Sequence, residues 1–422
     1  MIPKIRIGRW TASLLLVAVG LLLLSDGIRG RDDMLQLLRW WPAALVLWGV
    51  EYVVMLLLRR RYGGGRRFRL DVAGMLAASI LCASAFIVTQ QSHYLYLWNK
   101  VSLDLTSSSI EFSAAEGNKF TKPSVDVAAA LEMTALSVEG INGDIVIRRG
   151  FSDRIRIRST VWVDKLEPAD AREVAEKTGV KVDEGETLAV TTEAQVYGDG
   201  GRRQPRVDLE ILLPPERSFD MDIRTNGGSV TLNGVQALRA ISVQTGGGNL
   251  SFTNVGGNVS ASTSIGGIAA DTVAGNFQAV TQQGDIDSKN VAGSIDLQTL
   301  LGDISASGTI GGVAADTRNG SIEVAGANFG LSAQTLNGNI SIRSRVVQGD
   351  WSVYSAVGRI DLTLPDSGDY RMEGSNGYGD IRSELPFAIE DRTLTGTYGE
   401  GEFTVQADGN GDLNIFRAKE TD

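Results

Sequence analysis

Hydrophobic and polar positions divide the chain into two parts with different patterns. In the first hundred residues, long apolar runs alternate with clusters of arginine, whereas from about residue 135 apolar residues recur at every second position in short segments. A period of two is typical of β-strands with one buried face, and long apolar runs are typical of buried or membrane helices. The sequence therefore predicts apolar helices first and a β domain after them.

Three segments of the first part are long and apolar enough to approach or reach the thickness of a bilayer. We expect spans at about residues 10–28, 40–58 and 70–90, because a helix needs roughly 20 residues to cross the hydrocarbon. Basic residues at the N-terminus and at 59–69 favour the cytoplasmic side. The pattern predicts a multi-pass cell-membrane protein with a cytoplasmic N-terminus, in which the residues after about 95 are extracytoplasmic.

Two features of this part have competing interpretations. A cleaved signal peptide is the rival of the first span, and we favour a retained span because no small-x-small cleavage site follows Leu24. Glu51 lies near the middle of the second span, where a carboxylate is costly. This intramembrane polar residue is interpreted either as functional and facing a helix bundle or as a protonated packing residue, and both interpretations stay open.

Charge separates the same two parts. Residues 1–100 hold 13 Lys and Arg against 5 Asp and Glu, a balance of +8, whereas the remaining residues hold 27 against 45, a balance of −18. No basic face stands out, so we expect no nucleic-acid partner. The only cysteine, Cys82, and the only histidine, His93, precede residue 101. Disulfides, Cys/His zinc sites and histidine-dependent nucleophiles are therefore excluded from the acidic part.

An 18-residue repeat runs through the middle of the acidic part. Threonine and glycine each recur at this spacing over six copies, and apolar residues keep the same register. Each copy holds two short alternating segments, as in Ile295–Thr299 and Ile304–Ala306, separated by glycine-containing turns. The two columns, which we expect to be structural ladders, are Thr245, Thr263, Thr281, Thr299, Thr317 and Thr335, and Gly248, Gly266, Gly284, Gly302, Gly320 and Gly338.

A period near 20 with two strands and no helix is typical of a β-solenoid, in which equivalent residues of successive coils stack about 4.8 Å apart. We predict an all-β fold, a single-stranded parallel β-solenoid with 18-residue coils and two short strands per coil, preceded by an α-helical transmembrane region of three spans. The glycines should supply corner conformations, and the threonine hydroxyls should point inward and bond one another. Inward positions often hold alanine, so the two sheets should lie close together.

Looser copies of the repeat on both sides set the expected domain boundaries. One helix is predicted in the first irregular part, beginning at Pro168 and ending at Gly179. The expected domains are a transmembrane region at 1–100, a stalk or linker at 101–134 and an extracytoplasmic β-solenoid domain at 135–422. Within that domain, regular coils are expected at 241–346, and irregular or capping coils at 135–240 and 347–422.

Calcium is the most specific ligand that the repeat suggests. Gly266–Ala274 and Gly311–Asn319 match the calcium-binding nonapeptide of β-rolls at the glycines and the aspartate, but both have alanine at its third glycine and neither recurs in consecutive turns. Asp285 and Asp303 occupy one column in neighbouring coils, where a cation or solvent would relieve their repulsion. We favour solvent and predict no metal site, with Asp285 and Asp303 as the candidate metal ligands.

An enzyme acting on polysaccharides is the catalytic alternative. It would use the carboxylates of Asp285, Asp287, Asp296 and Asp303 as acid and base. Such sites need loops that leave the coil and form the walls of a cleft, whereas these coils are minimal and uninterrupted. We therefore predict that the protein is not an enzyme and that it uses no cofactor.

Parts of the chain resemble two bacterial families. The segments "VAVGLLLLSDG" and "WWPAALVLWGVEYVV" are similar to the LiaI/LiaF-like transmembrane region of envelope-stress proteins. The repeat "NGDI…GDISAS…NGSIEV…NGNISI" resembles a DUF4097-like family of adhesin-type proteins of unknown function with Gly-Asp-Ile repeats, related to toastrack-type domains; this match covers about residues 135–420. The resemblance implies a β-solenoid displayed outside a bacterial membrane for interaction, and it supplies no catalytic residues.

These observations predict a membrane-anchored extracytoplasmic β-solenoid that binds a partner and takes part in envelope-stress sensing or regulation. The alternative is a surface adhesin or cell-wall polysaccharide-binding module for which the helices are a simple anchor. The expected partners are the lipid bilayer and either other envelope-stress membrane proteins or cell-wall polymers, and homo-oligomers are compatible with the pattern. A regulator needs its own spans to act, whereas an adhesin needs only a tether.

Overall fold

The computed structural model describes residues 6–7, 69–70, 111–112, 115 and 117–418. The chain divides into two compact units, residues 1–102 and 103–422. In the first unit, the short strands β1 (Arg6–Ile7) and β2 (Arg69–Leu70) pair in parallel. The three expected spans and Glu51 fall outside the described residues, apart from the first residue of the third span. No helix within the described ranges is both long and apolar enough to cross a membrane.

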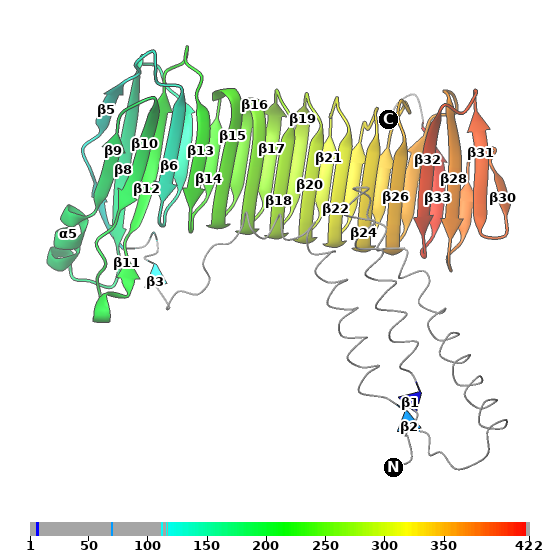
Figure 1. Cartoon of the computed structure of the whole chain (residues 1–422), viewed down its shortest axis with the longest axis horizontal. Helices are drawn as coiled ribbons and strands as arrows, with labels where there is room; N and C mark the ends of the chain where they lie inside the picture. Colours follow the sequence, from blue (N-terminus) through cyan, green and yellow to red (C-terminus); the bar gives the residue numbers. More distant parts are fainter. Residues whose placement is uncertain (1–5, 8–68, 71–110, 113–114, 116, 419–422) are drawn as a thin grey trace. The chain divides into compact units, whose positions relative to one another are not determined.

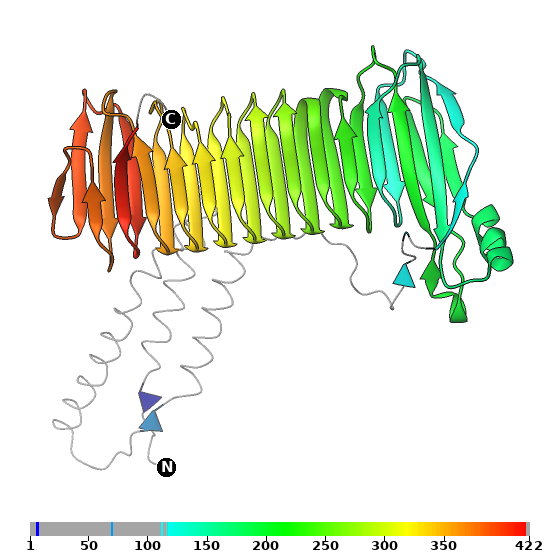
Figure 2. The same ribbon diagram turned by 180° about the vertical axis from the view of Figure 1, so that it is seen from behind.

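The second unit is an elongated stack of coils with two facing sheets, seen from its two sides in Figures 1 and 2. We call them sheet I and sheet II, and the regular strands of each sheet run parallel. The long strand β16 (Leu250–Ile265) belongs to both, because its first half pairs with β17 and its second half with β18. The other regular strands of sheet I are β15 (Gln236–Gly247), β18 (Phe277–Gln283), β20 (Ile295–Leu301), β22 (Val313–Asn319), β24 (Leu331–Asn337) and β26 (Trp351–Val357). Those of sheet II are β17 (Ile268–Val273), β19 (Ile286–Val291), β21 (Ile304–Ser307), β23 (Ile322–Ala325), β25 (Ile340–Arg343) and β27 (Ile360–Leu364).

Neighbouring regular coils pair at the 18-residue spacing of the sequence. In sheet I, Thr281 has Thr263 and Thr299 as its partners on either side. In sheet II, Ile286 pairs with its equivalents in the coils before and after it. The prediction of an all-β fold built from parallel coils with two strands each is therefore confirmed for this unit.

Alternate residues of each strand fill the space between the sheets. The inward positions combine large apolar residues with alanines such as Ala279 and Ala333, which are completely buried. Phe252 and Phe277 meet edge to face between the sheets, with ring centroids 5.9 Å apart. These alanines of the repeat therefore point inward, as the sequence pattern predicts.

The first coil along the chain is not the first coil of the stack. Its two strands, β6 and β7, pair on one side with β13 and β14, and on the other side with β10 and β12. The coil made of β10 and β12 therefore lies outside the coil that precedes it in sequence. These strands are β6 (Ala135–Gly140), β7 (Ile145–Arg149), β10 (Thr187–Glu193), β12 (Arg206–Leu213), β13 (Asp220–Thr225) and β14 (Val230–Asn233).

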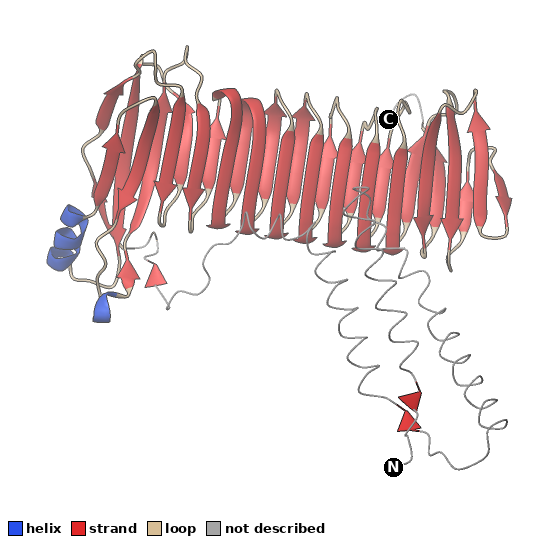
Figure 3. Cartoon of the chain, in the orientation of Figure 1, coloured by secondary structure: helices blue, strands red, loops and turns tan. Residues whose placement is uncertain are grey.

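Antiparallel strands and one helix cover this N-terminal end of the stack. The strand β8 (Arg154–Val163) pairs with β12, and β9 (Gly179–Asp183) pairs with β10. The helix α5 (Pro168–Lys177) packs beside them, and Figure 3 shows it in blue at this end. Pro168 is its first residue, as predicted, because proline has no N–H to lose in the first turn.

The C-terminal end repeats this arrangement in reverse. The last two strands of the chain, β32 (Phe403–Gly409) and β33 (Leu413–Arg417), lie between the coil β26–β27 and the coil made of β28 (Tyr370–Asn376) and β29 (Ile381–Ser383). An antiparallel hairpin closes sheet I beyond β28. Its strands are β30 (Ala388–Glu390) and β31 (Thr393–Tyr398).

Residues 118–128, which the sequence pattern assigns to a stalk, instead belong to the folded unit. The strands β4 (Asn118–Thr121) and β5 (Val125–Ala128) both pair antiparallel with β8. They are too short to show a clear period in a polar segment, and the free edge of β8 supplies their partners. Further upstream, β3 (Glu111–Phe112) pairs in parallel with β11 (Arg203–Gln204), so the chain is joined to the solenoid already at residue 111.

Candidate functional site on the solenoid surface

The turns between strands line up along two narrow edges of the stack. We call the edge formed by the turns that follow the sheet I strands the threonine edge, because Thr299 and its equivalents lie near the ends of those strands. The turns that follow the sheet II strands form the opposite edge. Each sheet also presents one flat outward face. A partner of the solenoid must therefore contact one of two edges, one of two faces or an end.

Glycine is required along the threonine edge because the coils approach one another closely there. A Cβ on Gly302 would lie 2.1 Å from the carbonyl oxygen of Gly284, and one on Gly358 would lie 1.9 Å from that of Gly338. Gly302 also has a φ of +153°, which other residues rarely adopt. The column extends beyond the regular repeat at both ends. In spatial order it contains Gly143, Gly228, Gly248, Gly266, Gly284, Gly302, Gly320, Gly338, Gly358, Gly411 and Gly379.

The threonine column bonds to this glycine column rather than to itself. The hydroxyl of Thr299 donates to the carbonyl oxygen of Gly284 at 3.0 Å, and the hydroxyl of Thr317 donates to that of Gly302 at 3.0 Å. The expectation that stacked hydroxyls bond one another is therefore wrong. The carbonyl of each glycine has no strand partner inside the turn, and the buried hydroxyl of the next coil satisfies it.

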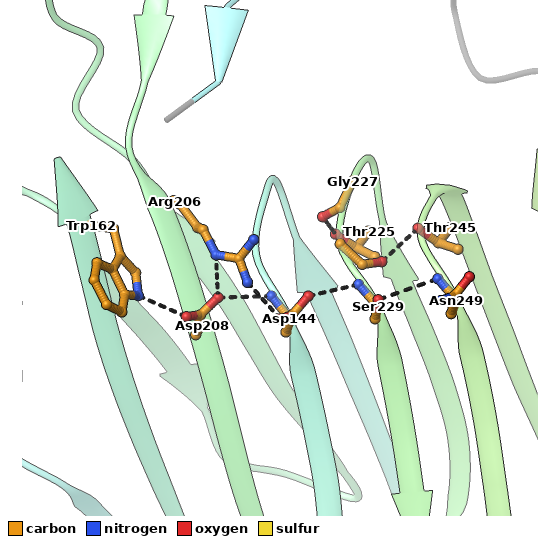
Figure 4. Close-up of polar contacts among 10 residues, drawn as sticks. Asp144, Trp162, Arg206, Asp208, Thr225, Gly227, Ser229, Thr245 and Asn249 are labelled. Atoms are coloured by element: carbon orange, nitrogen blue, oxygen red, sulfur yellow. Dashed lines mark hydrogen bonds and ion pairs between the residues drawn. The ribbon is translucent and has the colours of Figure 1, made fainter. Parts of the chain in front are cut away.

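A third column at this edge consists of side chains that accept backbone hydrogen bonds from the next coil (Figure 4). Asp208 Oδ1 accepts the N–H of Asp144 at 2.9 Å, Asp144 Oδ1 accepts the N–H of Ser229 at 2.8 Å, and Ser229 Oγ accepts the N–H of Asn249 at 3.2 Å. At the N-terminal end of this column, Arg206 donates hydrogen bonds to Asp208 at 2.8 Å and to Asp144 at 2.6 Å. Short polar side chains are suited to this role because they reach nearby backbone groups.

Asp285 and Asp303, the candidate metal ligands, belong to the same column. Asp285 Oδ1 accepts the N–H of Asp303 at 2.8 Å, and Asp303 Oδ1 accepts the N–H of Ser321 at 2.7 Å. Each carboxylate therefore points along the stack and uses one oxygen on the backbone, which reduces the repulsion between them. Sequence reasoning missed this role, although a column limited to Asp, Asn, Ser and Gly in the regular coils was a visible signal for it.

The four carboxylates of the catalytic alternative lie on different surfaces. Asp285 and Asp303 are at the threonine edge, Asp287 faces outward from sheet II, and Asp296 faces outward from sheet I. The Asp287 carboxylate accepts a hydrogen bond from Lys289 at 3.0 Å, whereas Asp296 accepts bonds from two glutamines. The structure therefore separates these groups rather than bringing them together as an acid and a base.

The outward face of sheet I carries uncharged hydrogen-bonding side chains in regular columns. Gln278 Nε2 and Gln298 Nε2 donate to the carboxylate of Asp296 at 3.3 and 3.0 Å, and Ser260 bonds Gln278 at 3.4 Å. Tyr354 is 40% exposed at the end of one column. From β15 to β26, basic side chains lie only toward the ends of the sheet I strands, where Arg239 precedes the regular part of β15 and Arg318 follows the buried Thr317 on β22. The outward residues between those ends include no Lys or Arg. They are Ser242, Gln244, Ser260, Ser262, Gln278, Val280, Asp296, Gln298, Ala314, Asp316, Ser332, Gln334, Ser352 and Tyr354.

The outward face of sheet II is charged by comparison. Lys289 pairs with Asp287, Arg343 pairs with Glu323, and the hydrogen bond from Lys289 to Asp287 raises the pKa of the lysine. Because both charges of such exposed pairs keep most of their hydration, each pair adds little to stability. The two faces of one stack therefore offer different chemistry to a partner.

An open pocket of about 570 Å³ lies on the opposite edge at the N-terminal end. It is bounded by the loops at 151–154 and 214–217, and Arg217 fixes its rim by donating to the carbonyl oxygens of Ala129 at 2.9 Å and Met133 at 2.7 Å. The side chain of Phe151 is fully exposed beside it. The sequence gives no signal for this pocket, because it is formed by loops that are far apart along the chain.

A second open pocket, of about 610 Å³, lies on the same edge toward the C-terminus of the described chain. Its lining consists of Ala325, Gly326, Asn328, residues 343–345, Thr363 and Ala418. Arg343 at its rim is already paired with Glu323. The pocket therefore offers mostly backbone and small side chains rather than a set of reactive groups.

A polar cluster fixes the loop to which the chain upstream of the solenoid is joined. Arg203 Nε and Tyr197 Oη both donate to Asp164 Oδ1 at 2.7 Å. The hydrogen bond to Asp164 raises the pKa of Arg203 well above its usual range, so the guanidinium stays charged although its side chain is mostly buried. Because β11 begins at Arg203, the cluster holds the strand that pairs with β3. We call the cluster together with the β3–β11 pair the entry clasp.

Comparisons with known proteins give a family match for the solenoid and several similar solved structures. The family model Toastrack DUF4097 matches residues 133–415. Similar solved structures include a candidate cell adhesion protein from Clostridium sporogenes (12% identity, 71% of this chain and 99% of that chain, TM-score 0.20) and a candidate adhesin from Bacteroides fragilis (11%, 71% and 97%, TM-score 0.28). A candidate lipid binding protein from Parabacteroides distasonis is also similar (12%, 73% and 100%, TM-score 0.32). No curated protein matches the chain.

Proposed function

Because the chain belongs to the Toastrack DUF4097 family, we propose that it is an adhesin-like surface module whose solenoid binds an extended, uncharged cell-wall polysaccharide on the outward face of sheet I. The observation that carries the proposal is the ladder of hydroxyl and amide side chains on that face. The first hundred residues anchor the module in the cell membrane, and the solenoid lies outside the cell.

The chemistry of the face suits a glycan. Its groups repeat at the strand spacing of about 4.8 Å, so a polymer with regular hydroxyl groups meets equivalent donors and acceptors along its length. Tyr354 offers an aromatic surface at the edge of the polar columns, where one face of a sugar ring is apolar enough to stack. The carboxylates of Asp296 and Asp316 disfavour an anionic polymer, although Arg318, two positions after Asp316 on β22, offsets part of their charge.

Binding to this face is tested with matched charge substitutions on the two faces. Ser332 faces outward from sheet I and Ser305 from sheet II, and both are half-buried. The full-length protein in detergent is mixed with chitin, an insoluble polysaccharide of uncharged sugars, and the fraction that sediments with it is measured. We expect Ser332→Arg to reduce that fraction at least fivefold and Ser305→Arg to leave it unchanged. Equal retention of both variants, or no retention of the unsubstituted protein, contradicts the proposal.

A regulatory role in envelope-stress sensing is the second candidate, and the entry clasp favours it. A simple tether needs no ordered connection, whereas here the strand at residues 111–112 pairs with the loop that Asp164 and Arg203 hold. A rigid connection at this point suits the transfer of a binding event toward the membrane spans and their partner proteins.

Exchange of the anchor separates the two candidates. Residues 1–100 are replaced by an unrelated three-span anchor, and both retention on chitin and the cell's envelope-stress response are measured. We expect retention to persist in either case. Loss of the stress response supports regulation through the native spans, whereas an unchanged response shows that the helices act only as a tether.

A further inference from the structure

Large apolar side chains are exposed at the tips of the threonine edge. In each regular coil, the two residues after the buried threonine, or after its equivalent Ser355, form the tip of the turn. Ile265 at one such tip is 62% exposed, although isoleucine is usually buried. The other exposed apolar residues at these tips are Leu300, Leu301, Leu336 and Val357. They lie in four of the seven coils from β15 to β26, those of Thr263, Thr299, Thr335 and Ser355, and therefore form an interrupted line along the stack rather than one isolated patch.

The same tips carry no carboxylate. From the coil of β15 to the coil of β26, the tip positions hold Gly, Ser, Ile, Gln, Leu, Arg, Asn, Ala and Val only. This is unusual in a part of the chain whose charge balance is −18. The nearest acids, Asp285 and Asp303, lie two positions beyond the tips and are directed along the stack by their backbone bonds.

The chain also enters the solenoid at this edge. The strand β11 ends at Gln204, two residues before Arg206, which caps the acceptor column of the threonine edge. The strand β3, which carries the chain from its first hundred residues, pairs with β11, and Figure 1 shows the two side by side below the first coils. The part of the chain that precedes residue 111 therefore leads into the solenoid at the end of the threonine edge.

We propose that the threonine edge lies on the outer surface of the lipid bilayer, so that the solenoid is oriented with its long axis along the membrane. The inference rests on the proposed membrane anchoring. Apolar tips flanked by amide and glycine positions suit the interfacial region, where side chains enter between head groups. Tips without carboxylates avoid repulsion from anionic lipids, which the acidic remainder of the domain would experience.

The opposite edge supplies the contrast. It exposes Ile310 by 61%, almost the same fraction as Ile265, but its turns and loops also carry carboxylates, such as Asp153, Glu216 and Asp350. Asp153 and Glu216 lie at the irregular N-terminal end, where the threonine edge also carries Asp144 and Asp208, so chain entry is the clearest distinction between the two edges. With the threonine edge on the lipid, the two pockets and the exposed Phe151 on the opposite edge remain open to the cell exterior.

The test compares two isoleucines of equal exposure on opposite edges. Full-length Cys82→Ser protein, which has no other cysteine, receives Ile265→Cys or Ile310→Cys and an environment-sensitive fluorophore. Each variant is reconstituted into phosphatidylcholine–phosphatidylglycerol vesicles with or without bromine on the acyl chains. We expect a blue-shifted emission and at least twofold stronger bromine quenching at position 265 than at position 310, with Leu301→Cys behaving like Ile265→Cys.

Other outcomes overturn the proposal in distinguishable ways. Equal or stronger quenching at position 310 assigns the wrong edge to the membrane. A blue shift at position 265 without bromine quenching means that protein covers the edge, either a second copy or the first hundred residues. Failure of the protein to float with the vesicles contradicts the membrane anchoring itself, and thus the proposed localisation rather than the choice of edge.

Discussion

The regular middle of the solenoid and its two ends use the same coil but connect it differently. In the middle, the hydrogen bond that the Asp303 N–H donates to the Asp285 carboxylate joins residues 18 apart in sequence. At the ends, equivalent bonds join residues much farther apart, 54 positions for Thr404 with Asp350 and 85 for Ser229 with Asp144. During folding, each coil of the middle can therefore pair with the coil that precedes it in sequence. At each end, a coil can pair only after a much longer segment of chain has folded back onto the stack.

The long-range connections protect the ends of the stack. An open strand edge is a template for pairing with another chain. Here the last strands of the chain, β32 and β33, have parallel partners on both sides, and sheet I finishes in the three-residue strand β30. Short antiparallel strands cannot continue the parallel stack, so another chain cannot add coils at the ends. Because contacts at the ends close long loops, we expect them to form more slowly during folding. The following substitutions test the middle against the ends.

Removal of the last coil should have the largest effect. Truncation after Glu400 deletes β32 and β33, which leaves β26 and β27 as open edges and β28 without its parallel partner. We expect loss of the folded C-terminal end and self-association, measured by size-exclusion chromatography and thermal unfolding. Truncation after Ala418 keeps both strands and serves as the control. A monomer with an unchanged thermal midpoint after the longer deletion would show that the inserted coil is dispensable.

A methyl group in the glycine column should be the most damaging single change in the middle. Gly302→Ala places a Cβ only 2.1 Å from the Gly284 carbonyl oxygen, so two coils must separate, and we expect a loss of more than about 3 kcal/mol in the free energy of unfolding. Gly326→Ala is the matched control, because its φ is also positive, at +77°, but nothing lies within 4 Å of the added Cβ.

The control should cost only about 1–2 kcal/mol for its backbone conformation. Denaturant titration of both variants measures the difference. Similar losses in the two variants would mean that backbone conformation, and not the approach of neighbouring coils, explains the glycine column.

Loss of one ladder hydroxyl should have a smaller effect. Thr299→Val keeps the shape of the side chain but leaves the Gly284 carbonyl without its donor, and we expect a loss of about 1–2 kcal/mol. Thr299→Ser retains the bond and should lose less, because Ser355 already makes the equivalent bond to Gly338 at 3.0 Å. The two denaturation midpoints are compared, and a serine variant weaker than the valine variant would contradict this ranking.

The sequence predicts the middle because every contact there repeats at one spacing. The 18-residue period alone identifies the partners of Thr281 and Ile286 in both sheets. At the ends, the segment "NGDLNI" at 410–415 indicates a further coil but not its place, because its insertion between β27 and β29 depends on long-range pairing. The local sequence pattern therefore predicts the two-stranded coil but not the order in which the coils stack.

The surface chemistry is only partly visible in the sequence. The columns of Asp285 and Thr299 are evident from their spacing, but the groups they bond are backbone atoms, which a sequence does not show. The contrast between the two faces follows once strand register is known, since alternate residues point outward. The loop pocket held by Arg217 leaves no periodic trace, because its bonds reach more than 80 residues back along the chain.

The smallest expected effect has the opposite sign and concerns another threonine. Thr309 is buried, and within the described part of the chain its hydroxyl has no hydrogen-bond partner. Val291 lies 18 residues earlier, and Val273 and Val255 precede it in the same column. Thr309→Val should therefore raise the free energy of unfolding by up to about 1 kcal/mol, since a buried hydroxyl without a partner is costly.

The pair Thr299→Val and Thr309→Val then forms a test of the ladder itself. The chemical change is identical, and only the presence of a glycine carbonyl opposite the hydroxyl differs. Denaturant titrations of both variants should shift in opposite directions. A loss at position 309 as large as that at position 299 would mean that a buried water bonds the Thr309 hydroxyl, and the threonine edge would not be the only place where a buried hydroxyl stabilises the stack.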